Sequence, residues 1–388
     1  MSIAARLGGK SSTGPRPRQG KMDVVFLILV LLLLVFGLVM LFSSSYVYAY
    51  YYEKGDSFIY IRRQAVYAAL GVVAMLVISR IDYHVFHWLA VPIMVGTIGL
   101  LAFTVVLKYT VNHGKITRWI RLGPIQFQPS EIAKFAIIIM FAQMACMYHN
   151  KIKTFRWGIL PFGVVLGMVC GLMLLEPHMS GTILIFCIGA SLMLIGGSNI
   201  KYFAIAAAAG LTLLLVALLA FDILGYARNR LTYYINPFLD PQNEGYQIIQ
   251  SMYAIASGGV LGKGLGNSKQ KFLYLPEPQN DFIFAIVCEE LGMVGAIVII
   301  LMFCVFIWRG FRIAMRSKDL FGTMIASGII IQFGLQAMLN MMVVTKTVPN
   351  TGISLPFFSY GGTALMMLLG EMGVLLNISR SSSVEKPI

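Results

Sequence analysis

Charged residues are scarce in this chain of 388 amino acids, which holds only 12% Asp, Glu, Lys and Arg. Soluble chains carry about 25% charged residues. The chain is 58% hydrophobic, with a mean hydropathy of +0.79. These values exclude a cytosolic enzyme and a secreted disulfide scaffold. The apolar residues run in solid blocks, each long enough to cross about 30 Å of hydrocarbon as a helix, which also excludes a transmembrane β-barrel.

Cysteines and acidic residues are also few. All five cysteines fall inside apolar blocks, so we expect small hydrophobic side chains in a membrane core and no disulfide framework. The chain has 30 Lys and Arg against 16 Asp and Glu, a formal net charge of +14. In a membrane protein this surplus indicates basic inner loops and contact with anionic membrane lipids, and we expect no nucleic-acid partner.

The apolar blocks predict an all-α polytopic membrane protein with about ten transmembrane helices. Residues 1–22 are rich in Gly, Pro, Ser and basic residues and predict a disordered cytoplasmic tail. A second short tail is expected over 381–388. The predicted spans cover 24–42, 64–79, 85–107, 129–148, 157–174, 180–197, 202–222, 282–308, 320–344 and 361–378.

The charge distribution predicts an orientation. An even number of spans puts both termini on one side, and the basic tail with the 309–318 loop makes that side the cytoplasm. Residues 223–281 then form one long extracellular loop, and loops of this length are commonly functional. Within it, residues 245–257 repeat apolar side chains at helical spacing, which predicts an amphipathic helix at the membrane.

One outer loop combines basic side chains with a helix start at 129–131, where Pro, Ser and Glu follow one another. Lys134 shares a face with Glu131, and a lysine at this depth faces the protein interior or a wet cavity. Two interpretations stay open. Glu131 and Lys134 either form an internal pair that holds the helix, or join Arg118 and Arg121 in a cationic wall for an anionic headgroup.

Two further segments carry candidate site residues. Asp281 stands where an extended, Pro-rich stretch enters an apolar run, so its carboxylate either caps a helix or projects into a cavity. The loop 349–363 before the last span is rich in Pro and Gly, and it must line a cavity or be buried in protein. Its Ser359 and Thr363 hydroxyls are candidate donors to a ligand, with a structural plug as the alternative.

Four segments taken together resemble the SEDS family (shape, elongation, division and sporulation proteins). They are Arg118-Trp119 with Gln128-Pro129-Ser130-Glu131 and Lys134, Gly245–Ser251, Leu275-Pro276-Glu277 with Asp281–Phe284, and Leu355-Pro356-Phe357 with Ser359–Gly362. The resemblance covers nearly all of the chain, as a single transmembrane domain over 23–380. Residues 265–279 and 373–380 are similar to the FtsW-like branch of division and sporulation. One departure is Glu176-Pro177-His178, where the family usually has Gln-Pro-Asp.

The resemblance implies a fold related to the lipid-dependent GT-C transferases. It implies a peptidoglycan glycosyltransferase that polymerises lipid II at the outer face of the bacterial cytoplasmic membrane. It also implies a class B penicillin-binding protein as a cross-linking partner, with other division proteins nearby. Asp281 matches the acid held essential in the family.

One carboxylate suffices for this chemistry. Glycoside hydrolysis generally takes two, because the leaving alcohol must be protonated. A lipid pyrophosphate needs positive charge instead, which Arg118, Arg121 and Lys134 would supply. Asp281 would take the proton of the acceptor hydroxyl, with inversion at the anomeric carbon. A divalent cation could share the charge, although no aspartate cluster demands one.

Two other functions stay open on the sequence. A lipid II flippase would need polar residues through the whole thickness of the membrane, whereas Glu131, Lys134 and Asp281 crowd toward the outer half. A non-catalytic scaffold of the division machinery predicts that Asp281 can be replaced without consequence. The sequence does not separate a role in division from one in sporulation.

Overall fold

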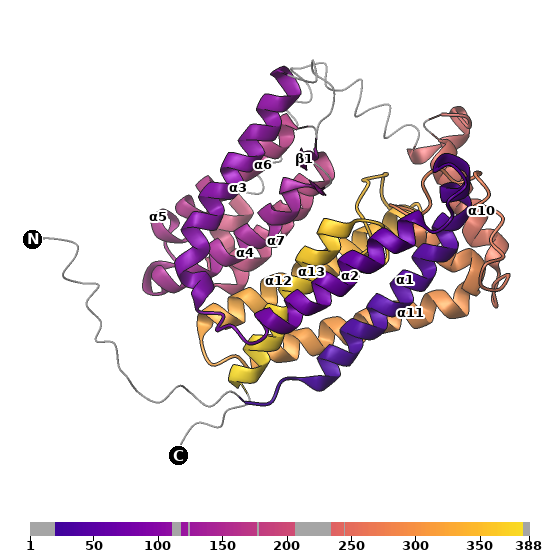
Figure 1. Cartoon of the computed structure of the whole chain (residues 1–388). Coiled ribbons are helices and arrows are strands. Elements are labelled where there is room, and N and C mark those ends of the chain that lie inside the picture. The colour runs from indigo at the N-terminus through magenta and orange to yellow at the C-terminus, as the bar shows by residue number, and fades with distance from the viewer. Residues whose placement is uncertain are drawn as a thin grey trace, which may run out of the picture.

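The computed structural model describes residues 20–110, 118–122, 125–176, 178–205, 234–243 and 245–382. Over these ranges the chain is a bundle of long helices with one small β-hairpin (Figure 1). The elements are α1 (Val24–Tyr52), α2 (Ile59–Ile78), α3 (Val85–Thr110), β1 (Ile120–Leu122), β2 (Ile125–Phe127), α4 (Pro129–Met147), η2 (His149–Lys151), α5 (Phe155–Gly158), α6 (Leu160–Leu175), α7 (Met179–Ile195), η3 (Pro237–Leu239), α10 (Tyr246–Gly258), α11 (Ile283–Met315), α12 (Leu320–Val344) and α13 (Gly362–Ser382).

The polytopic helical architecture is confirmed. Eight candidate spans in the described part are long and apolar enough to cross a membrane, and α7 is a shorter apolar helix. All the predicted spans but one coincide with helices. The exception, 202–222, lies beyond residue 205 outside the described residues, as do the first 19 residues, 223–233 and the last six. The five cysteines are unpaired.

The first helix is longer than its apolar run because it carries buried polar side chains. Asp23 caps α1, its Oδ1 accepting a hydrogen bond from the Phe26 amide at 2.9 Å. The apolar run ends at Phe42, but α1 continues to Tyr52. Residues 43–45 are serines that face the bundle interior, and Ser43 donates to Glu290. Because these serines are buried in the bundle, the helix continues past the point at which hydropathy alone predicts its end.

Three helices form the interior of the bundle. α4, α12 and α13 are the most buried of the candidate spans, each with 61% of its most apolar window buried, whereas the corresponding windows of α2 and α11 are 22% buried. α13 packs along α2, and α12 contacts α11 on one side and α4 and α7 on the other. Figure 1 shows α12 and α13 between the group α1, α2 and α11 and the group α3 to α7.

The long loop after residue 233 is folded onto α11. The predicted helix over 245–257 is confirmed as α10, whose buried face packs on α11, and Ser251 donates to the Val344 carbonyl at 2.9 Å. α11 itself breaks at Gly292, where φ is 67°. The backbone of 259–264 fills the break, with Gly264 donating to the Glu290 carbonyl at 2.9 Å. A Cβ on Gly262 would lie 2.2 Å from that carbonyl, so only glycine permits the approach.

Candidate functional site

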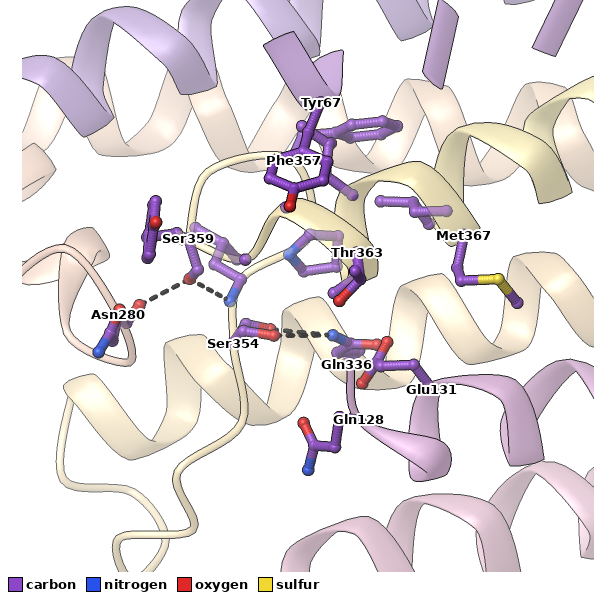
Figure 2. A pocket seen from close by; sticks show the side chains of 18 of the residues that line it. Tyr67, Gln128, Glu131, Asn280, Gln336, Ser354, Phe357, Ser359, Thr363 and Met367 are labelled. Carbon is purple, nitrogen blue, oxygen red and sulfur yellow. Dashed lines mark hydrogen bonds between the residues drawn. The ribbon is translucent and has the colours of Figure 1, made fainter. Parts of the chain in front are cut away.

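A polar cavity of about 720 Å³ lies where the first turns of α4 and α13 and the entry to α11 meet. Its charged and amide-bearing lining residues are Arg63, Gln126, Gln128, Glu131, Lys134, Asn280, Asp281, Gln332, Gln336 and Glu371. The loop 352–361 closes one side, and Figure 2 shows the lining side chains around it. Three helix N-termini with their positive partial charge thus converge on one polar space, which favours an anionic ligand.

Asp281 faces this cavity and does not cap the helix, so the structure favours the second of the two alternatives that the sequence left open. α11 begins after Phe282 with no side-chain cap hydrogen bond. Among the described residues, the Asp281 carboxylate accepts no hydrogen bond, and it lines the cavity. Its Oδ2 would lie 3.3 Å from a Cβ placed on Gly352, so the loop passes close to it.

The backbone around Asp281 is held on both sides. Asn340 of α12 donates to the Asp281 and Ile353 carbonyls, each at 2.7 Å. The Ser359 hydroxyl donates to the Asn280 carbonyl at 2.6 Å (Figure 2). The peptide is therefore fixed, while the carboxylate keeps its acceptor atoms available to a ligand.

Burial makes Asp281 a stronger base than an ordinary aspartate. Burial raises the pKa of Asp281 to about 6, the negative charge of Glu277 adds to the rise, and Arg118 opposes it. At neutral pH the carboxylate is ionised. Its affinity for a proton is then well matched to the working pH, as general-base catalysis requires.

Glu131 and Lys134 form the expected pair, and the pair faces the cavity. Lys134 Nζ lies 2.7 Å from Glu131 Oε2 and donates to Gln336 Oε1 at 3.0 Å. Gln336 in turn donates to the carbonyl and the hydroxyl of Ser354, both at 3.2 Å (Figure 2). The pair thus joins α4 to α12 and the loop, and it also puts an ammonium group on the wall of the cavity.

The two hydroxyl residues of the last loop lie on the cavity wall with different surroundings. Ser359 is buried, and its oxygen accepts from the Leu355 amide at 2.7 Å while donating to Asn280. Thr363 lies at the start of α13 and donates to the Gln126 carbonyl at 3.3 Å in an exposed position. Ser359 holds the wall together, whereas Thr363 is accessible from the cavity.

The two arginines expected beside the cavity occupy the hairpin and its approach. The charge of Arg118 lowers the pKa values of Asp281, Glu176 and His178, which places it among these three groups. Arg121 lies in β1 opposite Gln126, a lining residue, and its side chain is outside the described part.

The departure from the family pattern lies beside the same wall. His178 precedes α7 and is buried, and its Nε2 accepts from Gln128 Nε2 at 3.1 Å. Burial lowers the pKa of His178 to about 4 and raises the pKa of Glu176 to about 8. Both groups are therefore uncharged at neutral pH. His178 supports Gln128 as a neutral hydrogen-bond acceptor where the family usually has an acid.

Four further residues line the cavity although no motif in the sequence marks them as site residues: Arg63, Gln332, Gln336 and Glu371. Gln332 donates to both Glu371 oxygens, at 2.9 and 3.1 Å, so a buried carboxylate forms part of the cavity lining. The two glutamines lie four residues apart in an otherwise apolar helix and share a face, a spacing that points to a polar interior. Arg63 is exposed, and among the described residues its side chain makes no ion pair. The sequence feature that could have marked Arg63 is a basic residue one turn after the start of a transmembrane helix, α2.

The described residues contain no group of three or more His, Cys, Asp or Glu side chains arranged to hold a metal ion. A cation that accompanied a pyrophosphate would therefore depend on the phosphate oxygens for most of its ligands.

A second polar cluster on α11 is closed. Glu290 accepts from Lys271 Nζ at 2.8 Å and from the Ser43 hydroxyl, and both charged side chains are fully buried. Glu289 accepts from Lys263 Nζ at 2.6 Å, from the Ser268 hydroxyl and from two loop amides. This cluster binds the loop 259–271 to α1 and α11.

The fold and the cavity define a multi-pass membrane protein with an acid-bearing polar chamber among its helix starts. The family model of the cell cycle proteins FtsW, RodA and SpoVE matches residues 23–384. The chain belongs to this family.

Relatives and solved structures agree with this assignment. The chain is 41% identical over 362 residues to stage V sporulation protein E of Bacillus subtilis, covering 93% of this chain and 97% of the relative. It is 41% identical over 361 residues to the probable peptidoglycan glycosyltransferase FtsW of Geobacter sulfurreducens, covering 92% of this chain and 95% of that protein.

Two solved structures have the same fold. One chain comes from work on how a peptidoglycan synthase complex coordinates polymerization and crosslinking. It matches with a TM-score of 0.76 at 25% identity, over 93% of this chain and 98% of that chain. The rod shape determining protein RodA of Thermus thermophilus matches with a TM-score of 0.66 at 24% identity, over 94% of this chain and 98% of that chain.

Proposed function

We propose that this chain is a peptidoglycan glycosyltransferase that polymerises lipid II into glycan strands. The observation that carries the proposal is Asp281, whose peptide is clamped while its carboxylate stays available in a polar cavity. The family assignment and the names of the relatives support it.

Asp281 acts as the general base. It takes the proton of the acceptor hydroxyl as that oxygen attacks the anomeric carbon of the donor sugar. The new glycosidic bond forms as the bond from the anomeric carbon to the pyrophosphate breaks, and undecaprenyl pyrophosphate leaves with the electron pair. A single displacement inverts the configuration.

Positive charge around the cavity holds the leaving group. Lys134 lines the wall, Arg63 lines it from α2, and Arg118 lies close enough to act on Asp281. The N-termini of α4 and α13 add their partial charges. Guanidinium groups contact phosphate in a bidentate manner, whereas lysine contributes a point charge. Arg121, Glu131 and Thr363 complete the proposed substrate-binding set, with Ser359 holding the wall.

The depth of the cavity favours catalysis over transport. Along α13 the lining ends at Glu371, about 13 Å from the start of the helix at Gly362. Beyond it, Met372 and the residues 374–376 are apolar and buried. A polar path through about 30 Å of hydrocarbon would have to continue past this point.

A polymerase of lipid II also implies a location and a partner. Both termini lie in the cytoplasm, and the cavity opens at the outer face, where a polymerase of cell-wall precursors must work. A class B penicillin-binding protein cross-links the product, and other division proteins assemble with the pair. The match to a chain of a peptidoglycan synthase complex supports this partner.

A polymerisation assay tests the function. The purified protein, alone and with its cognate transpeptidase, receives labelled lipid II, and the products are separated on a gel. We expect a ladder of glycan strands. Transfer of lipid II across vesicle membranes without polymer would instead indicate a flippase, and neither result with both proteins folded would indicate a scaffold.

A labelling experiment tests the orientation. A reporter fused after Ile388 is expected to be cytoplasmic, and a cysteine placed at Asn243 is expected to react with impermeant reagents from outside. Reaction of that cysteine only from the cytoplasmic side would put the cavity on the wrong face of the membrane for polymerisation.

A further inference from the structure

A second cavity lies at the other end of the bundle from Asp281. It has a volume of about 220 Å³ and lies between the segment that leads into α1 and the last turns of α11 and α13. Figure 1 shows this end of the bundle, where the start of α1 and the end of α13 come together. Its charged lining residues are Lys21, Asp23, Arg309, Arg312 and Arg316.

The cavity carries an excess of positive charge. Its single acid, Asp23, is already engaged, because Oδ1 caps α1 and Oδ2 accepts from Arg309 Nε at 2.8 Å. Arg316 caps the end of α11 in a helical backbone conformation, and so it lies one turn beyond Arg312 on the same face. Among the described residues, the Arg316 side chain makes no hydrogen bond or ion pair, and Arg312 only stacks on Trp308, 5.1 Å from the ring centroid.

Contacts within the protein hold the walls of this cavity in place. The Asp23 amide donates to the Ser379 hydroxyl at 3.1 Å, and Ser379 donates to the Leu376 carbonyl at 2.7 Å. Arg380 contacts the Met22 sulfur at 3.6 Å. The last turns of α13 thus fix the segment opposite the arginines, so an anion would meet a preformed site.

We propose that this cavity binds the phosphate of an anionic phospholipid headgroup. Two guanidinium groups one turn apart match the oxygens of a phosphodiester. Basic pockets between transmembrane helices commonly bind such headgroups. The outer surface of α11 beside the site is apolar, with Val305, Trp308 and Met315 exposed by 45%, 56% and 74%. Tryptophan at this position is typical of the headgroup level of a membrane, and acyl chains can lie along this surface.

A matched pair of charge-removing variants tests the site. Arg312→Gln/Arg316→Gln removes the two available guanidinium groups. Lys153→Gln/Arg156→Gln removes the same charge, and Arg156 also stacks on a tryptophan, Trp157, at 5.8 Å. The control pair follows the end of α4, which runs away from the Asp281 cavity, so it lies at the same end of the bundle but outside the lining.

Each purified protein is mixed in detergent with phosphatidylglycerol, phosphatidylcholine or inorganic phosphate. Native mass spectrometry then counts bound lipid, and thermal unfolding measures stabilisation. We expect the unmodified protein to retain phosphatidylglycerol over phosphatidylcholine. Arg312→Gln/Arg316→Gln should lower phosphatidylglycerol binding about 30-fold, since each basic residue near an anionic lipid contributes about fivefold. The control pair should stay within about twofold.

Equal phosphatidylglycerol binding by the two variant pairs would overturn the proposal. Stabilisation by inorganic phosphate as large as that by phosphatidylglycerol would also overturn it, in favour of a free phosphate site. If Arg312→Gln/Arg316→Gln is not recovered folded, Arg316→Gln alone gives the same comparison. Arg316 is exposed, and a loss of about fivefold is then expected.

Discussion

Two groups of buried charges lie near the entry of α11, and they differ in what surrounds them. In the closed cluster, Lys271 and Glu290 are fully buried, and serine hydroxyls satisfy Glu289 and Glu290. In the open cavity, Glu131, Lys134 and Asp281 line a space of about 720 Å³, and the Asp281 carboxylate accepts no hydrogen bond from the described residues. An intramembrane charge therefore indicates a functional site only when space and free hydrogen-bonding capacity accompany it.

Replacing Asp281 with Asn should have the largest effect. The variant keeps the shape of the side chain but cannot accept a proton, so polymerisation should fall 10²- to 10⁴-fold, the usual range for general-base assistance. The measurement is the yield of glycan strands from purified protein. Melting temperature and partner binding should stay unchanged. Substantial polymer from Asp281→Asn would return this residue to a structural role.

Lys271→Met should affect stability more than any single change in the cavity. It leaves Glu290 buried without its cation, and breaking a buried pair in this way costs about 3–5 kcal/mol. Thermal unfolding in detergent measures the loss. Lys263→Met is the matched control, because the Lys263 side chain is 25% exposed and its partner Glu289 keeps Ser268 and two amides. Equal losses in both variants would contradict a closed cluster.

Lys134→Ala should lower activity more than stability, the reverse of Lys271→Met. Because Lys134 faces an open cavity, we expect the protein to stay folded and the turnover of lipid II to fall at least about tenfold, since one charge-assisted hydrogen bond contributes about 1.5–3 kcal/mol. Activity and melting temperature are measured together. If Lys134→Ala unfolds while Glu131→Gln/Lys134→Met is stable and active, the pair is structural.

Thr363→Val should have the smallest effect. The hydroxyl is exposed at the start of α13 and donates to the Gln126 carbonyl. Loss of one neutral hydrogen bond corresponds to a change of about two- to tenfold, expected in KM rather than in kcat. Initial rates over a range of lipid II concentrations separate the two parameters. A variant that abolishes turnover would place Thr363 at the reacting atoms.

Much of the fold can be predicted from the sequence, because a helix that crosses lipid must be apolar over most of its length. A hydropathy profile therefore locates most of the spans. The predicted starts at residues 85, 129 and 320 are the observed ones. The predicted end of a span is wrong where polar side chains face the interior of the bundle, as the serines 43–45 of α1 do. The break at Gly292 is equally invisible, because it depends on loop backbone that comes from residues 259–264.

The candidate site is predictable only in part for the same reason. The motif resemblance points to Asp281 and Lys134. The position of Asp281 along the chain, however, does not decide whether its carboxylate caps a helix or projects into a cavity. Contacts from distant parts of the chain decide between them: Asn340, 59 residues away, bonds the Asp281 carbonyl, and Ser359 bonds the carbonyl of the preceding residue, Asn280. Gln332 of α12 donates a hydrogen bond to Glu371 of α13, and no local sequence pattern predicts this contact.

The pH dependence of polymerisation tests the central claim, that Asp281 is the base, most directly. With its pKa raised to about 6, the carboxylate is protonated and inactive below that pH. The kcat/KM of the unmodified protein should therefore fall about tenfold per pH unit below pH 6 and level off above it. The residual activity of Asp281→Asn should lack this decline. A decline of equal slope and midpoint in both proteins would show that another group supplies the base.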